Sequence, residues 1–185
     1  MQLQHLILLS LLLILPSVLS CERESEYERL LQRELKKGVR NDSLFLGYHL
    51  GMERRAFFDH SWQLNQQGVV TGGVTVDYDL NELPHAAKMS YFPDFEGDKI
   101  QRMAVEISYH AWAPWNRDLY SDSLIVHLLE YYKEVYGNGF IETVHPRNGK
   151  RAWAKVDGNR QIMIHKHDDM VTRVEFEDLS AVETE

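Results

Sequence analysis

The sequence of 185 residues has a single cysteine, Cys21, and no excess of positive charge. One cysteine excludes an internal disulfide framework and any cluster of thiolate metal ligands. With 20 basic and 28 acidic residues the net charge is −8, so we expect no nucleic acid among the partners. The Gly-x-Ser-x-Gly, phosphate-loop and His-Glu-x-x-His motifs are also missing. We therefore assign no catalytic residue and no cofactor, and we favour a protein that is not an enzyme.

The first 20 residues are mostly apolar and contain no Lys, Arg, Asp or Glu. Their apolar run, residues 6–15, is shorter than the roughly 20 residues that a membrane-spanning helix needs. A run of this length followed by small residues is typical of a signal peptide. We therefore expect a signal peptide over residues 1–20 and a mature chain that begins at Cys21. All aromatic residues lie in that mature chain, which argues against disorder.

The residues Val18-Leu19-Ser20-Cys21 resemble the lipobox of bacterial lipoproteins. This resemblance implies that Cys21 carries lipid, such as palmitate, and anchors the chain to a membrane of the cell envelope. The sequence departs from the pattern because residues 1–5 contain no Lys or Arg. An uncleaved anchor and a secreted protein without lipid are the alternatives.

The acidic residues after Cys21 resemble the surface-export signal of Bacteroidetes-type lipoproteins, and a solvated linker is the alternative interpretation. The expected location is thus the outer membrane, facing the periplasm or the cell surface. Residues 22–37 have acids at the start, bases at the end and a thin apolar stripe, which predicts a helix that ends at Gly38. We expect a loosely packed, lipid-anchored helical stalk over residues 21–44. An acidic tail is expected over residues 179–185.

Residues 45–178 are predicted to form a single α+β domain of two similar halves. In the first half, residues 45–110, a helical face over residues 52–67 ends at Gly68 and is followed by about three alternating strands. The second half, residues 118–178, has a helix that Ser121 can cap and Gly137 ends. Four strands follow at 140–145, 151–157, 160–167 and 170–177. Asn148-Gly149 and Asp157-Gly158 favour tight hairpin turns between them, so the sheet should be antiparallel.

Two helix-plus-antiparallel-sheet units in tandem resemble the β-lactamase-inhibitor-like proteins and the small lipoprotein of the outer-membrane assembly machinery. The matching residues are Leu50-Gly51-Met52, Phe57 and Leu64 at the first helix, and Tyr136-Gly137 at the end of the second. The resemblance spans residues 45–178 and implies a fold that binds proteins without catalysis. It assigns no individual site residue.

The sheet of the second half has two faces, and alternation divides its residues between them. We assign Ala152, Ala154, Val156, Ile162, Ile164, Val174 and Phe176 to the core face. The alternate positions, which point to the opposite face of the sheet, include Trp153, His165 and Arg173. Because Trp and Arg are enriched at binding hot spots, Trp153 and Arg173 are candidate contacts for a partner. A solvated face partly covered by a loop is the alternative.

His165 and His167 are weak candidates for metal binding, because residues two apart on a strand share a face. A third ligand would have to come from elsewhere, with His145 or Asp169 as guesses. The alternative is an exposed strand end beside a turn. We expect no tight metal site at this pair.

The segment 109–120, which connects the halves, contains Trp112, Trp115 and Arg117 around Pro114. Proline predicts an extended loop here. Either one or both tryptophans fill the seam between the two sheet units, which we favour, or they form an aromatic platform for a sugar or a partner, with Asn116 and Arg117 as polar contacts.

The predicted function is a non-catalytic cell-envelope module that binds or scaffolds protein or glycan partners. The alternative is an extracellular hydrolase that uses acids on a sheet face, such as Asp77, Asp79 and Glu106.

Overall fold

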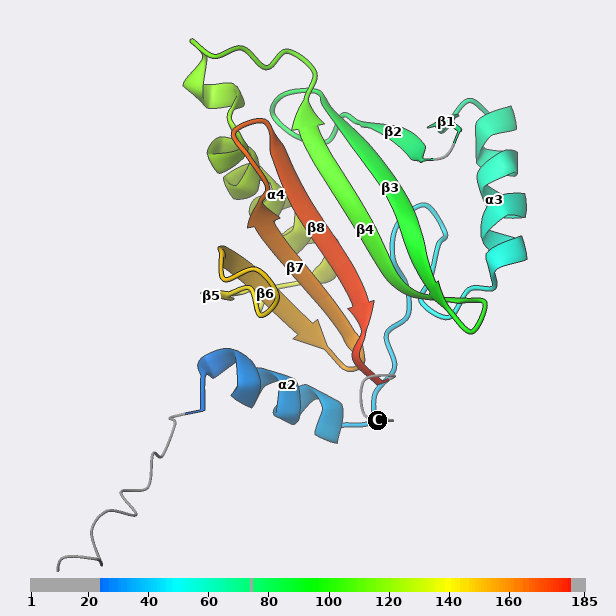
Figure 1. Cartoon of the computed structure of the whole chain (residues 1–185), viewed down its shortest axis with the longest axis vertical. Coiled ribbons are helices and arrows are strands. Elements are labelled where there is room, and N and C mark those ends of the chain that lie inside the picture. The colour runs from blue at the N-terminus through cyan, green and yellow to red at the C-terminus, as the bar shows by residue number, and fades with distance from the viewer. Residues whose placement is uncertain (1–23, 74, 181–185) are drawn as a thin grey trace, which may run out of the picture.

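A single antiparallel sheet of eight strands organises the computed structural model, which describes residues 24–73 and 75–180 (Figure 1). The strand order is β1-β2-β3-β4-β8-β7-β6-β5. The strands are β1 (Thr71–Gly72), β2 (Val76–Leu80), β3 (Ala87–Glu96), β4 (Lys99–Tyr109), β5 (Ile141–Val144), β6 (Arg151–Asp157), β7 (Arg160–Lys166) and β8 (Val171–Asp178). The helices are α2 (Glu26–Lys36), α3 (Arg54–Gln66), α4 (Ser121–Tyr136) and the short 3-10 helix η1 (Arg117–Leu119). The fold is therefore α+β, as the sequence predicted.

The sheet is continuous because the last strands of two meanders pair with each other. β4 pairs with β8 in antiparallel register, with Val105 opposite Val174. Each remaining pair joins strands that are neighbours in the sequence and are connected by short turns. The predicted hairpins in the second half are confirmed, and the positive φ angles of Gly149 and Gly158, 68° and 61°, suit tight turns.

The main core lies between the sheet and one layer of helix and loop. α4 buries Leu124, Ile125 and Leu128 against this face. The connection before α3 adds Tyr48 and Leu50 to the same core. α3 lies beside the β1–β2 edge and contributes the fully buried Phe57 (Figure 1). Among the described helices, none combines the length and the apolar character that crossing a membrane requires.

Two local details of the predicted elements differ in the structure. The first half has four strands rather than about three, because residues 70–80 divide into β1 and β2. Ser121 does not cap α4 with its side chain. Its hydroxyl instead donates to the carbonyl oxygen of Asp168, and this bond ties the helix start to the β7–β8 turn.

The helix expected as a loosely packed stalk lies against the sheet. α2 has a capping box in which Ser25 and Glu28 exchange hydrogen bonds. Its apolar stripe faces the sheet, where Leu30 packs with Val156 and Leu179. Tyr27 also contacts the outer face, the face opposite α4. Burial of this stripe explains the packing, since exposing it to water would cost free energy. The expected signal peptide, Cys21 and residues 181–185 of the expected tail lie outside the described residues.

The predicted face assignment of β6 is wrong. Trp153 pairs with Ile164, which in turn pairs with Val174, so all three share the face that α4 covers. Ala152 and Ala154 lie on the outer face, where α2 buries them under Tyr27. Both faces of the sheet are covered at β6, and alternation between apolar and polar residues therefore does not identify the core face.

Candidate functional site

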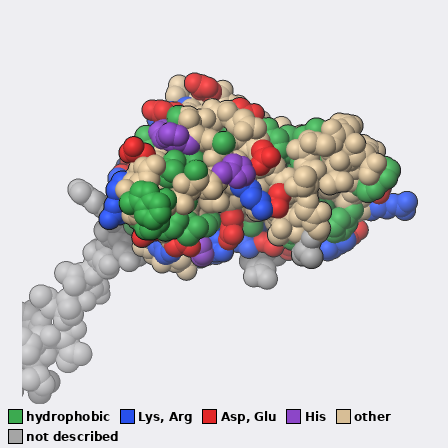
Figure 2. All heavy atoms as spheres, turned by 90° about the horizontal axis from the view of Figure 1, so that it is seen from above, with side chains coloured by type: hydrophobic (Ala, Val, Ile, Leu, Met, Phe, Trp, Pro, Cys, Tyr) green, Lys and Arg blue, Asp and Glu red, His purple; other side chains and the backbone are tan. Residues whose placement is uncertain are grey.

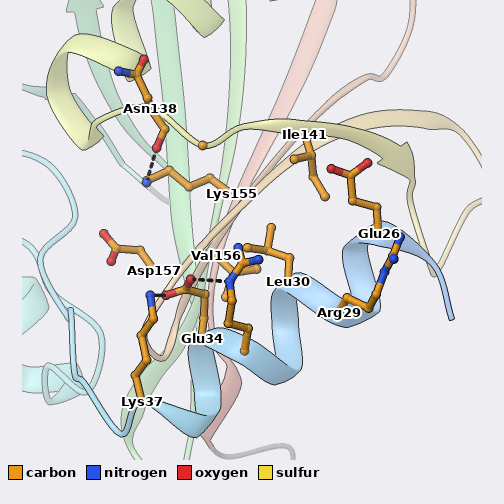
Figure 3. Close-up of a pocket in the computed structure, with 12 residues that line it drawn as sticks. Glu26, Arg29, Leu30, Glu34, Lys37, Asn138, Ile141, Lys155, Val156 and Asp157 are labelled. Carbon is orange, nitrogen blue, oxygen red and sulfur yellow. Dashed lines mark hydrogen bonds and ion pairs between the residues drawn. The ribbon is translucent and has the colours of Figure 1, made fainter.

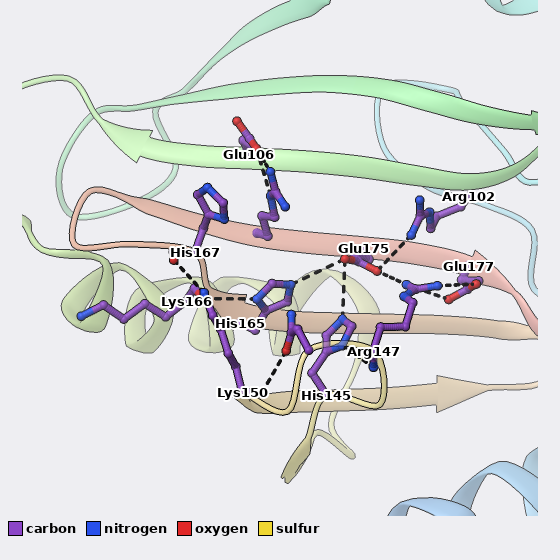
Figure 4. Close-up of polar contacts among 12 residues, drawn as sticks. Arg102, Glu106, His145, Arg147, Lys150, His165, Lys166, His167, Glu175 and Glu177 are labelled. Carbon is purple, nitrogen blue, oxygen red and sulfur yellow. Dashed lines mark hydrogen bonds and ion pairs between the residues drawn. The ribbon is translucent and has the colours of Figure 1, made fainter.

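Three ionisable side chains meet on the outer face of the sheet, where the loop after β5 folds over β6 and β7 (Figure 4). They are His145 at the start of this loop, His165 on β7 and Glu175 on β8. His165 lies opposite Ala152 in the register, and the small alanine leaves room for the ring of His145. The two imidazole rings are in edge contact, with centroids 4.6 Å apart. Strand pairing thus brings together residues from three separate parts of the chain.

The loop that carries His145 is held by its own backbone. The amide of His145 donates to the carbonyl oxygen of Lys150 at 2.8 Å, and the amide of Gly149 donates to the carbonyl oxygen of His145 at 2.9 Å. Gly149 supplies the positive φ that this turn requires. The position of the His145 ring is therefore fixed by local turn chemistry.

The ring nitrogens of the cluster are buried and point at one carboxylate oxygen. His145 is 1 % exposed and His165 is 2 % exposed. Their Nε2 atoms lie 3.6 Å and 3.5 Å from Glu175 Oε1, and neither has a hydrogen-bond partner among the residues that the structure describes. A buried polar atom without a partner is uncommon and costs free energy, which marks this cluster as a functional candidate.

Two arginines hold the other oxygen of the same carboxylate. Arg147 donates to Glu175 Oε2 and also to Glu177, and Arg102 lies 3.6 Å from Oε2. Burial by itself would raise the pKa of Glu175, but the His165 side chain and the positive charge of Arg147 lower it to about 2. Glu175 is therefore ionised at neutral pH, with Oε1 left toward the imidazoles.

The two histidines have different hydrogen bonds at Nδ1. Nδ1 of His165 lies 3.3 Å from the carbonyl oxygen of Lys166, and because a carbonyl oxygen can only accept, Nδ1 carries the proton of this contact. Nδ1 of His145 accepts from the backbone amide of Arg147 at 3.1 Å, which places the proton of a neutral ring on Nε2. Burial lowers the pKa of His145, and this favours the neutral ring, although the nearby carboxylate of Glu175 opposes the shift.

The structure separates the two histidines that the sequence linked as a metal pair. His165 belongs to the buried cluster, whereas His167 is exposed beyond the end of β7. Of the two guesses for a third ligand, His145 lies in the cluster, and Asp169 instead pairs with Lys166 at 2.8 Å. Sequence reasoning missed Glu175 because only the β7–β8 and β4–β8 pairings bring it to this position.

A hollow of about 390 Å³ lies next to the cluster, over β3, β4 and β8. Glu175 lines it together with Phe92, Glu106 and Arg173. The acids proposed for a hydrolase do not converge here as a free pair. Glu106 is bound by Arg173 at 2.6 Å, Asp77 by Lys88 at 2.7 Å, and Asp79 by His110 at 3.1 Å. Burial would raise the pKa of Asp77, but hydrogen bonds from Lys88 and Ser90 lower it overall.

The segment 109–120 places its two tryptophans in different environments. Trp115 is 85 % exposed and does not fill the predicted seam, which leaves Trp112 as the candidate for that role. Trp112 is half-buried against Tyr120, with ring centroids 5.6 Å apart, and its indole Nε1 is buried. Arg117 covers the ring of Tyr120 at 4.5 Å. Figure 2, seen from this end of the molecule, shows hydrophobic side chains gathered at the surface beside histidines.

Trp153 and Arg173 do not form one surface. Trp153 lies on the α4 side under Arg151, whose guanidinium is 4.7 Å from the ring centroid. Arg173 lies on the outer face, opposite His165 in the register. The prediction that the two residues share one surface is therefore wrong, because Trp153 lies on the face of the sheet that α4 covers.

A second groove runs between α2 and the β5–β6 edge (Figure 3). Some of its charged side chains are engaged within the molecule. Glu34 pairs with Lys37 at 2.6 Å, and Lys155 donates to the carbonyl oxygen of Asn138 at 2.8 Å. Glu34 and Lys155 therefore already have partners within the molecule.

Comparison with protein-family models, curated proteins and solved structures finds no match to this chain.

Proposed function

We propose that this chain is a non-catalytic, lipid-anchored module of the cell envelope that binds a protein or glycan partner through the segment 109–120. The observation that carries the proposal is the exposure of Trp115, 85 % of whose surface is accessible. An aromatic side chain of this size is a favourable anchor for a sugar ring or a partner side chain.

The surroundings of Trp115 suit a recognition surface. Trp112 and Tyr120 form a packed base for the loop, and the hydroxyl of Tyr120 donates to the carbonyl oxygen of Pro114 at 2.9 Å. The side chain of Asn116 accepts from the amide of Asp118, which starts η1. Such internal bonds reduce the entropy that a partner must remove from the loop on binding.

The place of this loop fits an anchored module. In Figure 1 the loop lies at the top of the molecule and α2 lies at the bottom. Lipid on Cys21, only a few residues before α2, would therefore leave the aromatic loop pointing away from the membrane. We further infer that residues 45–110 and 118–178 are two related units. The order of one helix followed by four antiparallel strands in each supports this.

The hydrolase alternative receives no support from the acids named for it, because each of Asp77, Asp79 and Glu106 already pairs with a neighbouring side chain. A glycosidase requires one carboxyl group that can donate a proton and a second that can act as base or nucleophile. We therefore retain the binding module as the conclusion.

The experiment compares two exposed tryptophans. Wild-type protein, Trp115→Ala and Trp62→Ala are immobilised and incubated with solubilised envelope from the producing bacterium, and in parallel with a glycan array. Trp62 is 65 % exposed on α3 and serves as the matched control. We expect Trp115→Ala to lose a partner that wild type and Trp62→Ala retain. Equal capture by all three proteins would overturn the proposal.

A further inference from the structure

We infer that His145, His165 and Glu175 form a binding site for a divalent transition-metal ion, with zinc as the best-suited ion. Two imidazoles and one carboxylate are a common ligand set for zinc. This set also suits other first-row ions, since imidazole binds most of them well. The site lies on the outer face of the sheet and is independent of the aromatic loop.

The geometry of the ligand atoms supports a common ion. Zinc bonds of about 2.0–2.1 Å in a tetrahedron place ligand atoms about 3.3–3.4 Å apart. The two Nε2 atoms lie 3.6 Å and 3.5 Å from Glu175 Oε1. These distances exceed an ordinary N–H···O hydrogen bond of about 2.9–3.0 Å. The three side chains therefore surround a point rather than bonding one another, and all three ligand atoms lie within 4.8 Å of one another.

The burial of the site also points to a ligand. Nε2 of His145 and Nε2 of His165 are both buried, and within residues 24–73 and 75–180 neither has a hydrogen-bond partner. A bound cation would satisfy both nitrogens at once. Glu175 is the member of the cluster that also lines the neighbouring hollow.

Groups around the ligands orient them. The carbonyl oxygen of Lys166 accepts from Nδ1 of His165, an arrangement that directs Nε2 of a histidine to a metal. Arg147 binds Oε2 of Glu175 and so leaves Oε1 for the ion. The positive charges of Arg147 and Arg102 act against a cation, but Glu177 and Asp94 bind these arginines and offset part of that charge.

One hydrogen bond must open when the ion binds. The amide of Arg147 donates to Nδ1 of His145, so the neutral ring has its proton on Nε2. Coordination through Nε2 transfers this proton to Nδ1, and Nδ1 then cannot accept from Arg147. The amide of Arg147 is therefore a direct reporter of coordination by His145.

The test is calorimetric titration of the purified, chelator-treated full chain with zinc chloride. We expect one ion per chain with a submicromolar Kd. His165→Ala and the nearly isosteric Glu175→Gln should weaken binding by about two orders of magnitude, since each removes a ligand. His167→Ala is the matched control, because His167 is a surface histidine of the same segment outside the cluster. It should bind zinc as wild type does.

A second measurement needs no variant and separates site binding from loss of folding. In ¹H–¹⁵N spectra of the wild type, zinc should shift the backbone amide resonance of Arg147. The amide resonance of Asn116, which lies far from the cluster in the chain, should stay unshifted. The inference would be overturned if zinc showed no saturable binding, or if His167→Ala lost as much zinc affinity as His165→Ala. It would also be overturned if Glu175→Gln bound zinc with unchanged affinity, or if zinc left the Arg147 amide resonance unshifted. The aromatic loop supplies no ligand to this site, so failure of these tests would leave the proposed function standing.

Discussion

The α-carbon of Gly158 packs directly against the backbone carbonyl oxygen of Val39, so a β-carbon at this position would overlap that oxygen. Gly158 also has a φ of 61° in the turn between β6 and β7. The contact joins the connection after α2 to the sheet. Asn41 extends this junction by donating from Nδ2 to the side chain of Asp157 at 2.7 Å.

Gly158→Ala should therefore destabilise the fold more than an alanine in another tight turn. Gly149→Ala is the control, because Gly149 has a φ of 68° and open space where its β-carbon would lie. The positive φ should cost each variant roughly 1–2 kcal/mol, and Gly158→Ala should lose more through the overlap with Val39. Urea unfolding of both variants measures this difference, and equal losses would contradict the prediction.

Asp178 should make stability depend on pH in the acid range. Burial would raise the pKa of this carboxyl, but hydrogen bonds from Ser180, Asn159 and Arg40 lower it overall. The pKa of Asp178 in the folded state lies below its unfolded value of about 3.9. The ionised carboxylate therefore contributes fully to the free energy of unfolding above about pH 3.9, and this contribution is lost as the pH falls through the folded pKa.

Asp178→Asn is the variant that isolates this contribution. At neutral pH it should be less stable than wild type by roughly 1.5–3 kcal/mol, because it weakens hydrogen bonds to a charged group. The difference in free energy of unfolding between wild type and Asp178→Asn should become smaller below about pH 4. Asp59→Asn, at an exposed position on α3, should follow the wild-type curve. If this difference stayed constant from neutral pH down to acid unfolding, the charge of Asp178 would not be the source of the pH-dependent stability.

The two tryptophans of the segment 109–120 should differ in their effect on folding. Trp112→Ala removes the packing on Tyr120 and should cost roughly 2–3 kcal/mol. Trp115→Ala, at an 85 % exposed position, should stay within about 0.5 kcal/mol of wild type. Chemical unfolding of both variants tests this, and a large loss in Trp115→Ala would assign that residue a structural role.

Lipid on Cys21 is a separate prediction from the lipobox resemblance. Protein extracted from membranes should have an intact mass that corresponds to a di- or triacylated chain beginning at Cys21. Cys21→Ser removes the thiol that would carry the lipid, so this variant should leave the membrane fraction. Recovery of wild-type chains that still begin at Met1 would refute the lipoprotein interpretation.

Local patterns were sufficient for most of the secondary structure. Asn148-Gly149 and Asp157-Gly158 predicted the turns around β6, because type I′ turns require the positive φ that glycine adopts easily. The face of α4 followed from the helical spacing of Leu124 and Leu128. Helical and strand periodicity likewise predicted an α+β fold, which the structure confirms, but the two predicted sheets form one continuous sheet of eight strands.

Alternation failed at β6, where the second layer decides which face is buried. Ala152 and Ala154 looked like core residues, and they are buried, but under α2 rather than under α4. Trp153, assigned to the outer surface, packs with the main core. A periodic pattern reports that one side of a strand is apolar, and it contains no information about which layer covers that side.

The sequence by itself determined the turns, the helices, the alternating strands and the one thiol available for an anchor. Only the tertiary structure decided that His145, His165 and Glu175 meet and that Trp115 is exposed while Trp112 is packed. Turns and helices depend on residues a few positions apart, whose conformational preferences are local. The cluster depends on strand pairing between residues that are distant in the chain, and its members acquire a common environment only when β8 pairs with β7.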